Sequence, residues 1–92
     1  MIKEIVRSSK FKRQYKKLMK KHYDQTLFED ALHALVFQET AKLNTKFKDH
    51  QLVDRAGIRE LHISGDWLLL YQIDGEKLIL YLLETGSHDE LL

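Results

Sequence analysis

The sequence predicts an α+β domain in which two N-terminal helices pack on a mainly antiparallel sheet of about four strands. Two patterns predict this fold class. Between residues 10 and 39, apolar side chains recur at spacings of three and four, the period of one helix face. Between residues 58 and 84, short apolar runs alternate with turn residues, which is typical of strands. The 92 residues are expected to form a single domain, 1–92, with one modest core.

A short strand and a helix are expected to open the chain. Residues 2–7 are rich in β-branched side chains, which favours a strand. A helix is expected over residues 10–21, because Ser8 or Ser9 can accept a hydrogen bond from its first turn. Its apolar residues form one stripe, so its many basic side chains are expected to be exposed.

A second helix and a long loop complete the first half. Asp24 or Thr26 can cap the helix, which is expected to end between residues 37 and 39. Its wide apolar face predicts burial against both the sheet and the first helix. From residue 40 to 57 the periodicity fails, so we expect a loop there, and long loops in small domains are often functional.

Three strands are expected in the second half, at residues 58–63, 67–73 and 77–84. The second and third are apolar on both faces at many positions, which suits interior strands of a sheet covered by helices. The sequence Asp74-Gly75-Glu76 is a compact hairpin connection between them.

The net charge of +1 conceals an uneven distribution. Residues 1–22 hold nine Lys or Arg and one acid, a formal charge of +8, whereas residues 23–92 hold six bases and thirteen acids, a charge of −7. A segregated basic surface indicates a polyanion such as RNA or an acidic protein partner, and a solvated helix face explains it equally well. The basic side chains of the first helix are Lys10, Lys12, Arg13, Lys16, Lys17, Lys20 and Lys21.

The composition also excludes several classes of protein. The absence of Cys excludes disulfides and thiolate metal sites, and it fits a reducing cytoplasm, where we expect the protein to act. The longest apolar run is far shorter than a membrane span, so no membrane association is expected. Charges within the first seven residues argue against a secretory signal.

Three histidines and an aspartate stand near the ends of the predicted strands: His62, Asp66 and His88, with His50 in the preceding loop. RNA cleavage without a metal requires one group that takes the ribose 2′-hydroxyl proton and another that protonates the leaving 5′-oxygen. Imidazoles suit both transfers because they titrate near neutrality. Nearby Lys and Arg side chains would stabilise the charge of the phosphorane.

Other interpretations of these residues remain open. The histidines are also what exposed loops and strand ends carry without any function. His50, His62 and His88 are a conceivable three-imidazole zinc site, although their spacing matches no recognised ligand motif. We therefore expect no metal and no other cofactor. Trp67 and Tyr71 could stack on unpaired bases if exposed, but strands this apolar favour burial of both.

Three segments carry a resemblance to a known family: K-F-K-D-H-Q-L at 46–52, I-R-E-L-H-I-S-G-D-W-L-L-L-Y at 58–71 and L-E-T-G-S-H-D-E-L-L at 83–92. Together they resemble YafQ-type toxins of the RelE/ParE superfamily. The resemblance implies a RelE-like toxin fold and a ribosome-dependent endoribonuclease that cleaves mRNA in the A site and inhibits translation. It also implies the toxin half of a type II toxin–antitoxin system.

The resemblance assigns roles to individual residues. It implies that His88 is a general acid or base, that Asp66 or His50 performs the opposite proton transfer, and that His62 orients groups or stabilises charge. It further implies contacts with RNA phosphates by Lys46, Lys48 and Arg59, and we add Trp67 as a candidate RNA contact. In a regular strand, however, Arg59 faces away from His62, so a bulge or bend is needed before both contact one phosphate.

The resemblance also implies partners. They are a cognate antitoxin, the ribosome with its mRNA, and operator DNA bound through the antitoxin complex. The basic first helix would then meet ribosomal RNA or an acidic segment of the antitoxin.

Two positions depart from the family pattern. Glu84 stands where members often carry a basic residue, and Leu91-Leu92 stand where they tend to have an aromatic one. These departures keep two alternatives open: a non-catalytic inhibitor similar to ParE-type gyrase poisons, and an inactive toxin-like binding module. The histidines distinguish the nuclease from the first alternative, because a gyrase poison does not need them.

Overall fold

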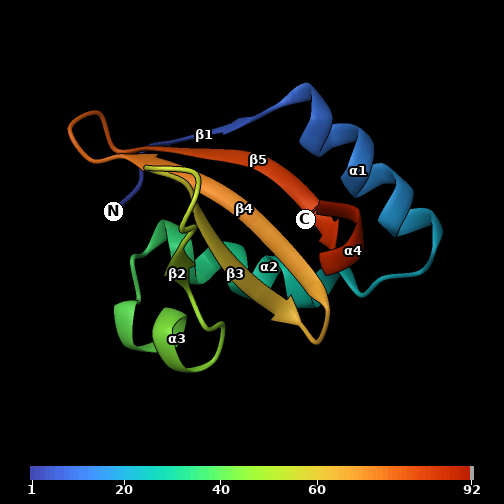
Figure 1. The fold of residues 1–92 in the computed structure, drawn as a ribbon. Coiled ribbons are helices and arrows are strands. Elements are labelled where there is room, and N and C mark those ends of the chain that lie inside the picture. The colour runs from blue at the N-terminus through green and yellow to red at the C-terminus, as the bar shows by residue number, and fades with distance from the viewer. Residues whose placement is uncertain (92) are drawn as a thin grey trace.

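The computed structural model describes residues 1–91 and contains one five-stranded sheet in the order β1-β5-β4-β3-β2 (Figure 1). The predicted α+β class, with two N-terminal helices on the sheet, is confirmed. In chain order the elements are β1 Glu4–Arg7, α1 Ser9–Lys20, α2 Gln25–Val36, α3 Thr40–Thr45, β2 His50–Gln51, β3 Arg59–Ser64, β4 Trp67–Asp74, β5 Ile79–Ser87 and α4 His88–Leu91.

The sheet is antiparallel except at one edge. There β1 runs parallel to β5, while β2, β3, β4 and β5 pair antiparallel with their neighbours. The expectation of about four strands omitted β2, whose two residues are too few to show a period in the sequence.

Both long helices begin at the residues expected to cap them. The Ser8 hydroxyl accepts a hydrogen bond from the Phe11 N–H at 2.9 Å and donates one to the Leu83 carbonyl at 2.7 Å. The start of α1 is thereby fixed to β5. At α2, the Asp24 carboxylate accepts from the N–H of Thr26 at 2.9 Å.

The core lies between these helices and one face of the sheet. From the helices it contains buried Phe11 and Leu18 of α1 and Phe28 and Leu35 of α2. From the sheet it contains the side chains of Leu61, Ile63, Trp67, Leu69, Tyr71, Leu80 and Leu82. Among residues 1–91, no helix has the length and hydropathy needed to cross a membrane.

The segment from residue 40 to 57 is not the continuous loop that was expected. It opens with α3. Two lysines of this segment attach it to α2 by ion pairs with Asp30: Lys42, whose Nζ lies 2.9 Å from the carboxylate, and Lys46. Buried Leu43 and Phe47 hold the other side of this segment. Six residues make less than two helical turns, so packing rather than a sequence period defines this helix.

The last strand is longer than expected. It was expected to end at residue 84 but continues to Ser87, so the Thr85-Gly86-Ser87 sequence lies within β5. Thr85 is buried, and its hydroxyl donates a hydrogen bond to the Leu68 carbonyl at 2.8 Å. A side chain at Gly86 would approach Glu90 to 3.1 Å, so glycine lets α4 fold back close to the strand. Leu92, which with Leu91 was named as a departure from the family pattern, lies outside the described residues.

Candidate active site

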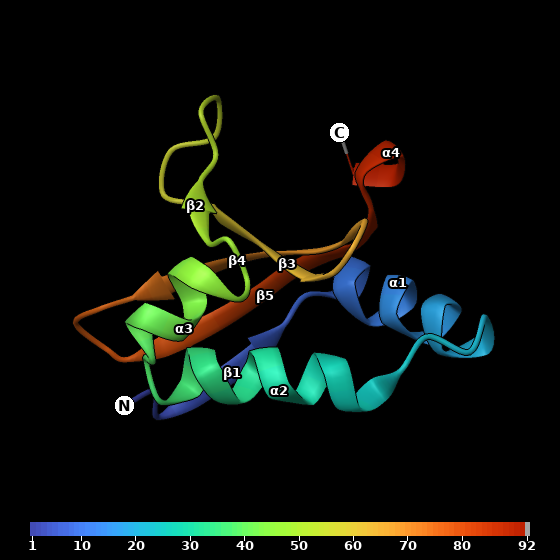
Figure 2. The ribbon, with the colours of Figure 1, turned by 90° about the horizontal axis from the view of Figure 1, so that it is seen from below.

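The long helices cover one face of the sheet, and the candidate site lies on the other. Figure 2 shows α1 and α2 on one side, and the chain after β2 together with α4 on the opposite side. Residues paired directly across antiparallel strands point to the same side. We call the face opposite the long helices the second face. Two rows of paired residues cross it: one contains His50, Glu60, Leu70 and Glu84, and the other contains His62, Leu68 and Gly86.

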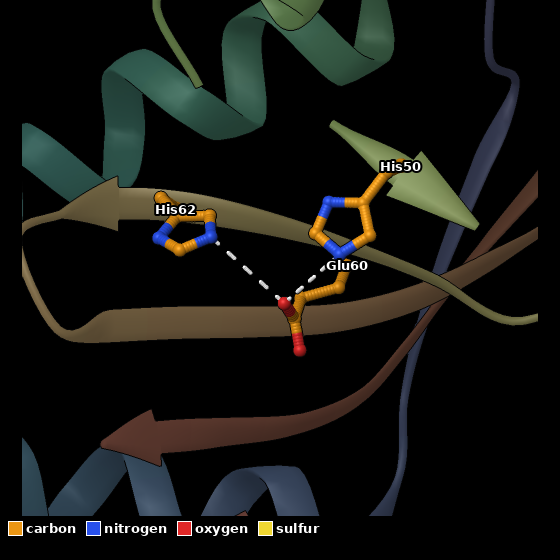
Figure 3. Close-up of side chains that lie close together, drawn as sticks. All are labelled: His50, Glu60 and His62. Atoms are coloured by element: carbon orange, nitrogen blue, oxygen red, sulfur yellow. Dashed lines mark ion pairs between the residues drawn. The ribbon is translucent and has the colours of Figure 1, made fainter. Parts of the chain in front are cut away.

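The structure brings His50 and His62 together around Glu60 (Figure 3). The His50 Nε2 lies 3.2 Å from the Glu60 Oε1, and the His62 Nε2 lies 3.9 Å from the same oxygen. Strand pairing places His50 opposite Glu60, and the two-residue period of β3 places His62 on the same face. Two residues predicted to be catalytic thus share one carboxylate.

The backbone before β2 determines how His50 is oriented. The N–H of His62 donates to the Phe47 carbonyl at 2.7 Å, which attaches this segment to β3. Lys48 has a left-handed backbone with φ of 51°, and its carbonyl oxygen lies 2.9 Å from the His50 Nδ1. Because a carbonyl can only accept, Nδ1 carries a proton. The His50 Nε2 is therefore the ring nitrogen that faces the Glu60 carboxylate.

Glu60 was not predicted from the sequence. Its residue is 4% exposed, and its Oε2 has no hydrogen-bond partner within residues 1–91. A buried carboxylate oxygen without a partner is costly, which makes Glu60 a candidate functional residue. The signal available in the sequence was an acidic residue two positions before His62, on the same face of an otherwise apolar strand.

The same three residues form the group of the described chain that could hold a metal ion. One ligand atom each of His50, Glu60 and His62 lie within 4.8 Å of one another. Imidazole and carboxylate ligands suit zinc. This group differs from the three-imidazole set considered in the sequence, because Glu60 takes the place of His88.

Asp66 and His88 form a second pair where the β3–β4 turn meets α4. The N–H of His88 donates to the Asp66 Oδ1 at 3.2 Å. The His62 Nδ1 lies 3.4 Å from the carbonyl oxygen of Gly65, which precedes Asp66. The two pairs of predicted catalytic residues therefore adjoin through this turn.

Reciprocal hydrogen bonds hold the helix that carries His88. The Ser87 N–H donates to the Glu90 Oε1 at 2.9 Å, and the Glu90 N–H donates to the Ser87 Oγ at 3.3 Å. The bond from the Ser87 backbone is the main cause of a lowered pKa for Glu90. This capping orients a four-residue helix that is too short to be stable by itself.

Two of the residues predicted to contact phosphate form ion pairs with carboxylates away from the histidines. Arg59 lies opposite Tyr71, and its Nε is 3.1 Å from the Asp49 Oδ1. The bulge in β3 falls after His62, so Arg59 and His62 stay on opposite faces, and Arg59 does not join the histidines. Lys46 pairs with Asp30 at the contact between α2 and α3. Lys48 remains exposed, two residues before His50.

The structure buries Trp67, for which a contact with RNA was predicted, and does not bring it to the surface beside the histidines. Trp67 is 3% exposed and belongs to the core, where its ring meets Tyr23 edge-on at a centroid distance of 5.1 Å. Its indole N–H donates to the Thr85 hydroxyl at 2.9 Å. Burial on both sides leaves no ring face for base stacking, in agreement with the apolar character of β4. Tyr71 is likewise buried, and burial raises its pKa.

The basic side chains of the first helix are exposed, as the sequence predicted. Lys10 reaches the second face, where its Nζ lies 3.1 Å from the Glu84 Oε1. A cavity of about 300 Å³ on this helix is lined by Lys10, Arg13, Gln14 and Lys17. A second cavity, of about 450 Å³, lies between α1, α2 and β1 and is lined by core residues such as Phe11 and Phe28.

Comparisons with known proteins agree on one family. A family model described as bacterial toxin of type II toxin–antitoxin system, YafQ, matches residues 3–92. The mRNA interferase toxin YafQ of Escherichia coli strain B is 32% identical over 89 residues, which cover 96% of this chain and 94% of that protein.

Solved structures extend this similarity to the whole fold. A metal-bound toxin from Helicobacter pylori is 34% identical and superposes with a TM-score of 0.89, with all of both chains covered. YafQ in the Escherichia coli DinJ–YafQ toxin–antitoxin complex is 28% identical with a TM-score of 0.82, covering 100% of this chain and 99% of that one. The protein therefore belongs to the YafQ family of bacterial toxins of type II toxin–antitoxin systems.

Proposed function

We propose that this toxin is a ribosome-dependent endoribonuclease that cleaves mRNA in the A site and thereby stops translation. Its relatives are mRNA interferases, so family membership makes the chain an endoribonuclease. The observation that carries the catalytic proposal is the pair of imidazoles around Glu60, with Asp66 and His88 at the adjoining turn.

The proposed reaction is attack of a ribose 2′-hydroxyl on the adjacent phosphorus. The 2′-oxygen forms a bond to phosphorus and loses its proton to a base, while the bond from phosphorus to the 5′-oxygen breaks. That oxygen gains a proton from an acid, so the products are a 2′,3′-cyclic phosphate and a 5′-hydroxyl. No metal is required, because both steps are proton transfers.

The side chains on the second face can supply both transfers. We assign one transfer to His50, whose Nε2 lies 3.2 Å from the Glu60 Oε1, and the other to His88, which stands exposed at the start of α4. His62 stabilises charge beside Glu60, and Asp66 fixes the backbone that carries His88. Lys48 provides a cation beside His50 for the phosphate.

The test is to map the 5′ ends of mRNA after incubation with purified ribosomes, comparing the wild type with His88→Ala. We expect cuts within A-site codons that His88→Ala slows by about 100-fold or more, the usual contribution of a general acid or base. A chelator that removes zinc and other transition metals but leaves the Mg²⁺ that ribosomes require should leave the rate unchanged. Unaltered cleavage in His50→Ala, Asp66→Ala and His88→Ala alike would overturn the catalytic assignment, and loss of cleavage on chelation would overturn metal independence.

The two alternatives give different results in cells. A ParE-like gyrase inhibitor would cause DNA damage while translation continues, and an inactive binding module would leave growth unimpaired after induction without antitoxin. Arrest of translation as the first event supports the nuclease. The cytoplasm is the compartment in which this substrate occurs.

We further propose a cognate antitoxin as the protein partner. The YafQ relative in the Escherichia coli complex is bound to DinJ, and the exposed basic helix here is complementary to an acidic segment. Binding of operator DNA would then occur through the toxin–antitoxin complex.

A further inference from the structure

Glu84 pairs with two cationic side chains on the second face. Its Oε1 lies 3.1 Å from the Lys10 Nζ, and its Oε2 lies 3.2 Å from the Arg55 Nη1. Lys10 comes from α1 and Arg55 from the chain between β2 and β3, so Glu84 joins two segments that are distant in sequence. Its side chain is 11% exposed, whereas those of Lys10 and Arg55 are 59% and 39% exposed.

These exposures decide which groups can meet a ligand. An arginine has five N–H donors and a lysine has three, so one contact each with Glu84 leaves donors free. The carboxylate lies beneath, while the two cationic heads reach solvent. With one acid and two bases, the local formal charge is +1, and the solvent side of the group is cationic.

The position of this group relative to the histidines follows from strand pairing. Glu84 and Glu60 lie in the same row with Leu70 between them, which places them about 10 Å apart at the usual strand spacing. Donors at one end of the row and proton-transfer groups at the other suit one strand of RNA crossing the second face. The cations would hold a phosphate that flanks the one being cleaved.

We propose that Arg55 and Lys10 form a phosphate clamp for a single RNA strand and that Glu84 is its positioning residue. This inference rests on the proposed RNA cleavage. Glu84 restrains two long side chains before the RNA arrives, which reduces the entropy that they lose on binding. An acidic residue at this position thereby delivers positive charge to the substrate through its neighbours.

The salt dependence of RNA binding tests the clamp. Affinity of a short single-stranded RNA is measured by fluorescence anisotropy over a range of salt concentrations, with His88→Ala in every protein to prevent cleavage. Each lost phosphate contact reduces the slope of log affinity against log salt by about 0.7 for a single strand. We expect this reduction for Arg55→Ala and for Lys10→Ala, with affinity about 10-fold lower at low salt.

Two controls make the result specific. Arg55→Lys keeps the charge and should keep the slope. Lys77→Ala removes an exposed charge from the β4–β5 turn and should change neither slope nor affinity. Equal slopes for Arg55→Ala and Lys77→Ala, with circular dichroism confirming that both are folded, would overturn the clamp.

The positioning role of Glu84 is tested by a double-mutant cycle. In the Glu84→Gln background, we expect Arg55→Ala to weaken binding by less than about 3-fold, because the guanidinium is no longer held. Strictly additive losses would show that Glu84 does not position Arg55.

Cleavage by proteins that retain His88 is measured separately on ribosomes. If Arg55→Ala and Lys10→Ala reduce the salt slope but the protein does not cleave mRNA, the clamp is supported and the nuclease is rejected. If the protein cleaves mRNA but the slope is unchanged, the nuclease is supported and the clamp is rejected.

Discussion

Two buried glutamates on the second face differ in what surrounds them. Glu84 has a cation at each carboxylate oxygen, so its burial is compensated. Glu60 faces two imidazoles with one oxygen and has no partner for the other among the described residues. A fold optimised for stability alone would not keep such an oxygen. Glu60 is therefore the residue at which stability and activity are expected to oppose each other.

Glu60→Met tests this opposition. Methionine has a similar shape and no unsatisfied oxygen, and His50 and His62 are exposed enough to be hydrated once the carboxylate is gone. We expect the free energy of unfolding to fall by no more than about 1 kcal/mol, or to rise. The cleavage rate should fall about 100-fold. Thermal unfolding and mRNA cleavage on ribosomes measure the two effects.

The control is Glu76→Met, which changes an exposed glutamate in the β4–β5 turn and should alter neither quantity. A clear loss of stability with full activity in Glu60→Met would show that this carboxylate is structural.

The elements that the sequence failed to predict are those that place the site. The spacing of apolar residues was sufficient to predict α1 and α2. Residue type narrowed each cap to two candidates, Ser8 or Ser9 and Asp24 or Thr26, and the structure selects Ser8 and Asp24. The two residues of β2 and the six of α3 have no period of their own, and pairing with β3 or Asp30 defines them. The contact of His50 with Glu60 depends on β2, so Glu60 could not be recognised as its partner in advance.

At α4 the structure predicts a dependence on pH. The pKa of Glu90 lies below its ordinary value of 4.5, mainly because of the hydrogen bond from the Ser87 N–H. Its ionised form therefore stabilises α4 above that value, and this contribution is lost as the pH falls through the lower, folded pKa. We expect the Ser87 amide to exchange faster with solvent as the carboxylate is protonated. Amide resonances followed by NMR from neutral to acidic pH measure this.

Glu90→Gln serves as the comparison, because it keeps the size of the side chain but does not ionise. Its Ser87 exchange should lack the step in this pH range once the intrinsic pH dependence of exchange is subtracted. An identical step in both proteins would assign the transition to another group.

On the scale of the whole molecule, charge and chemistry occupy adjoining regions. The formal charge of +8 in residues 1–22 lies mostly on α1, which packs against β5, the strand that leads to His88. The charge separation was evident from the sequence, but the pairing of Lys10 and Arg55 with Glu84 was not. Arg55 and Glu84 are 29 residues apart, and only the fold shows that they meet.

This arrangement predicts that α1 contributes to ribosome binding. We expect the double variant Lys12→Glu and Lys16→Glu to bind ribosomes at least about 10-fold more weakly at low salt, since opposite charges attract strongly there. The difference should shrink as salt is added. Sedimentation with purified ribosomes measures it.

The matched control is Lys3→Glu with Lys77→Glu, which makes the same change of net charge away from α1. Equal weakening by both double variants would show that total charge, rather than the helix, governs binding.

The parallel pairing of β1 with β5 has a consequence for folding during synthesis. β1 is synthesised first but cannot pair until β5 has been made, because its hydrogen-bonding neighbours lie about 75 residues later in the chain. The hydrogen bond from Ser8 to Leu83 spans the same separation. His88 also lies beyond that last strand. Neither the complete sheet nor the full proposed site can form on a nascent chain until residue 88 has left the ribosome. The proposed nuclease would thus lack a complete site for attacking the ribosome that is still synthesising it.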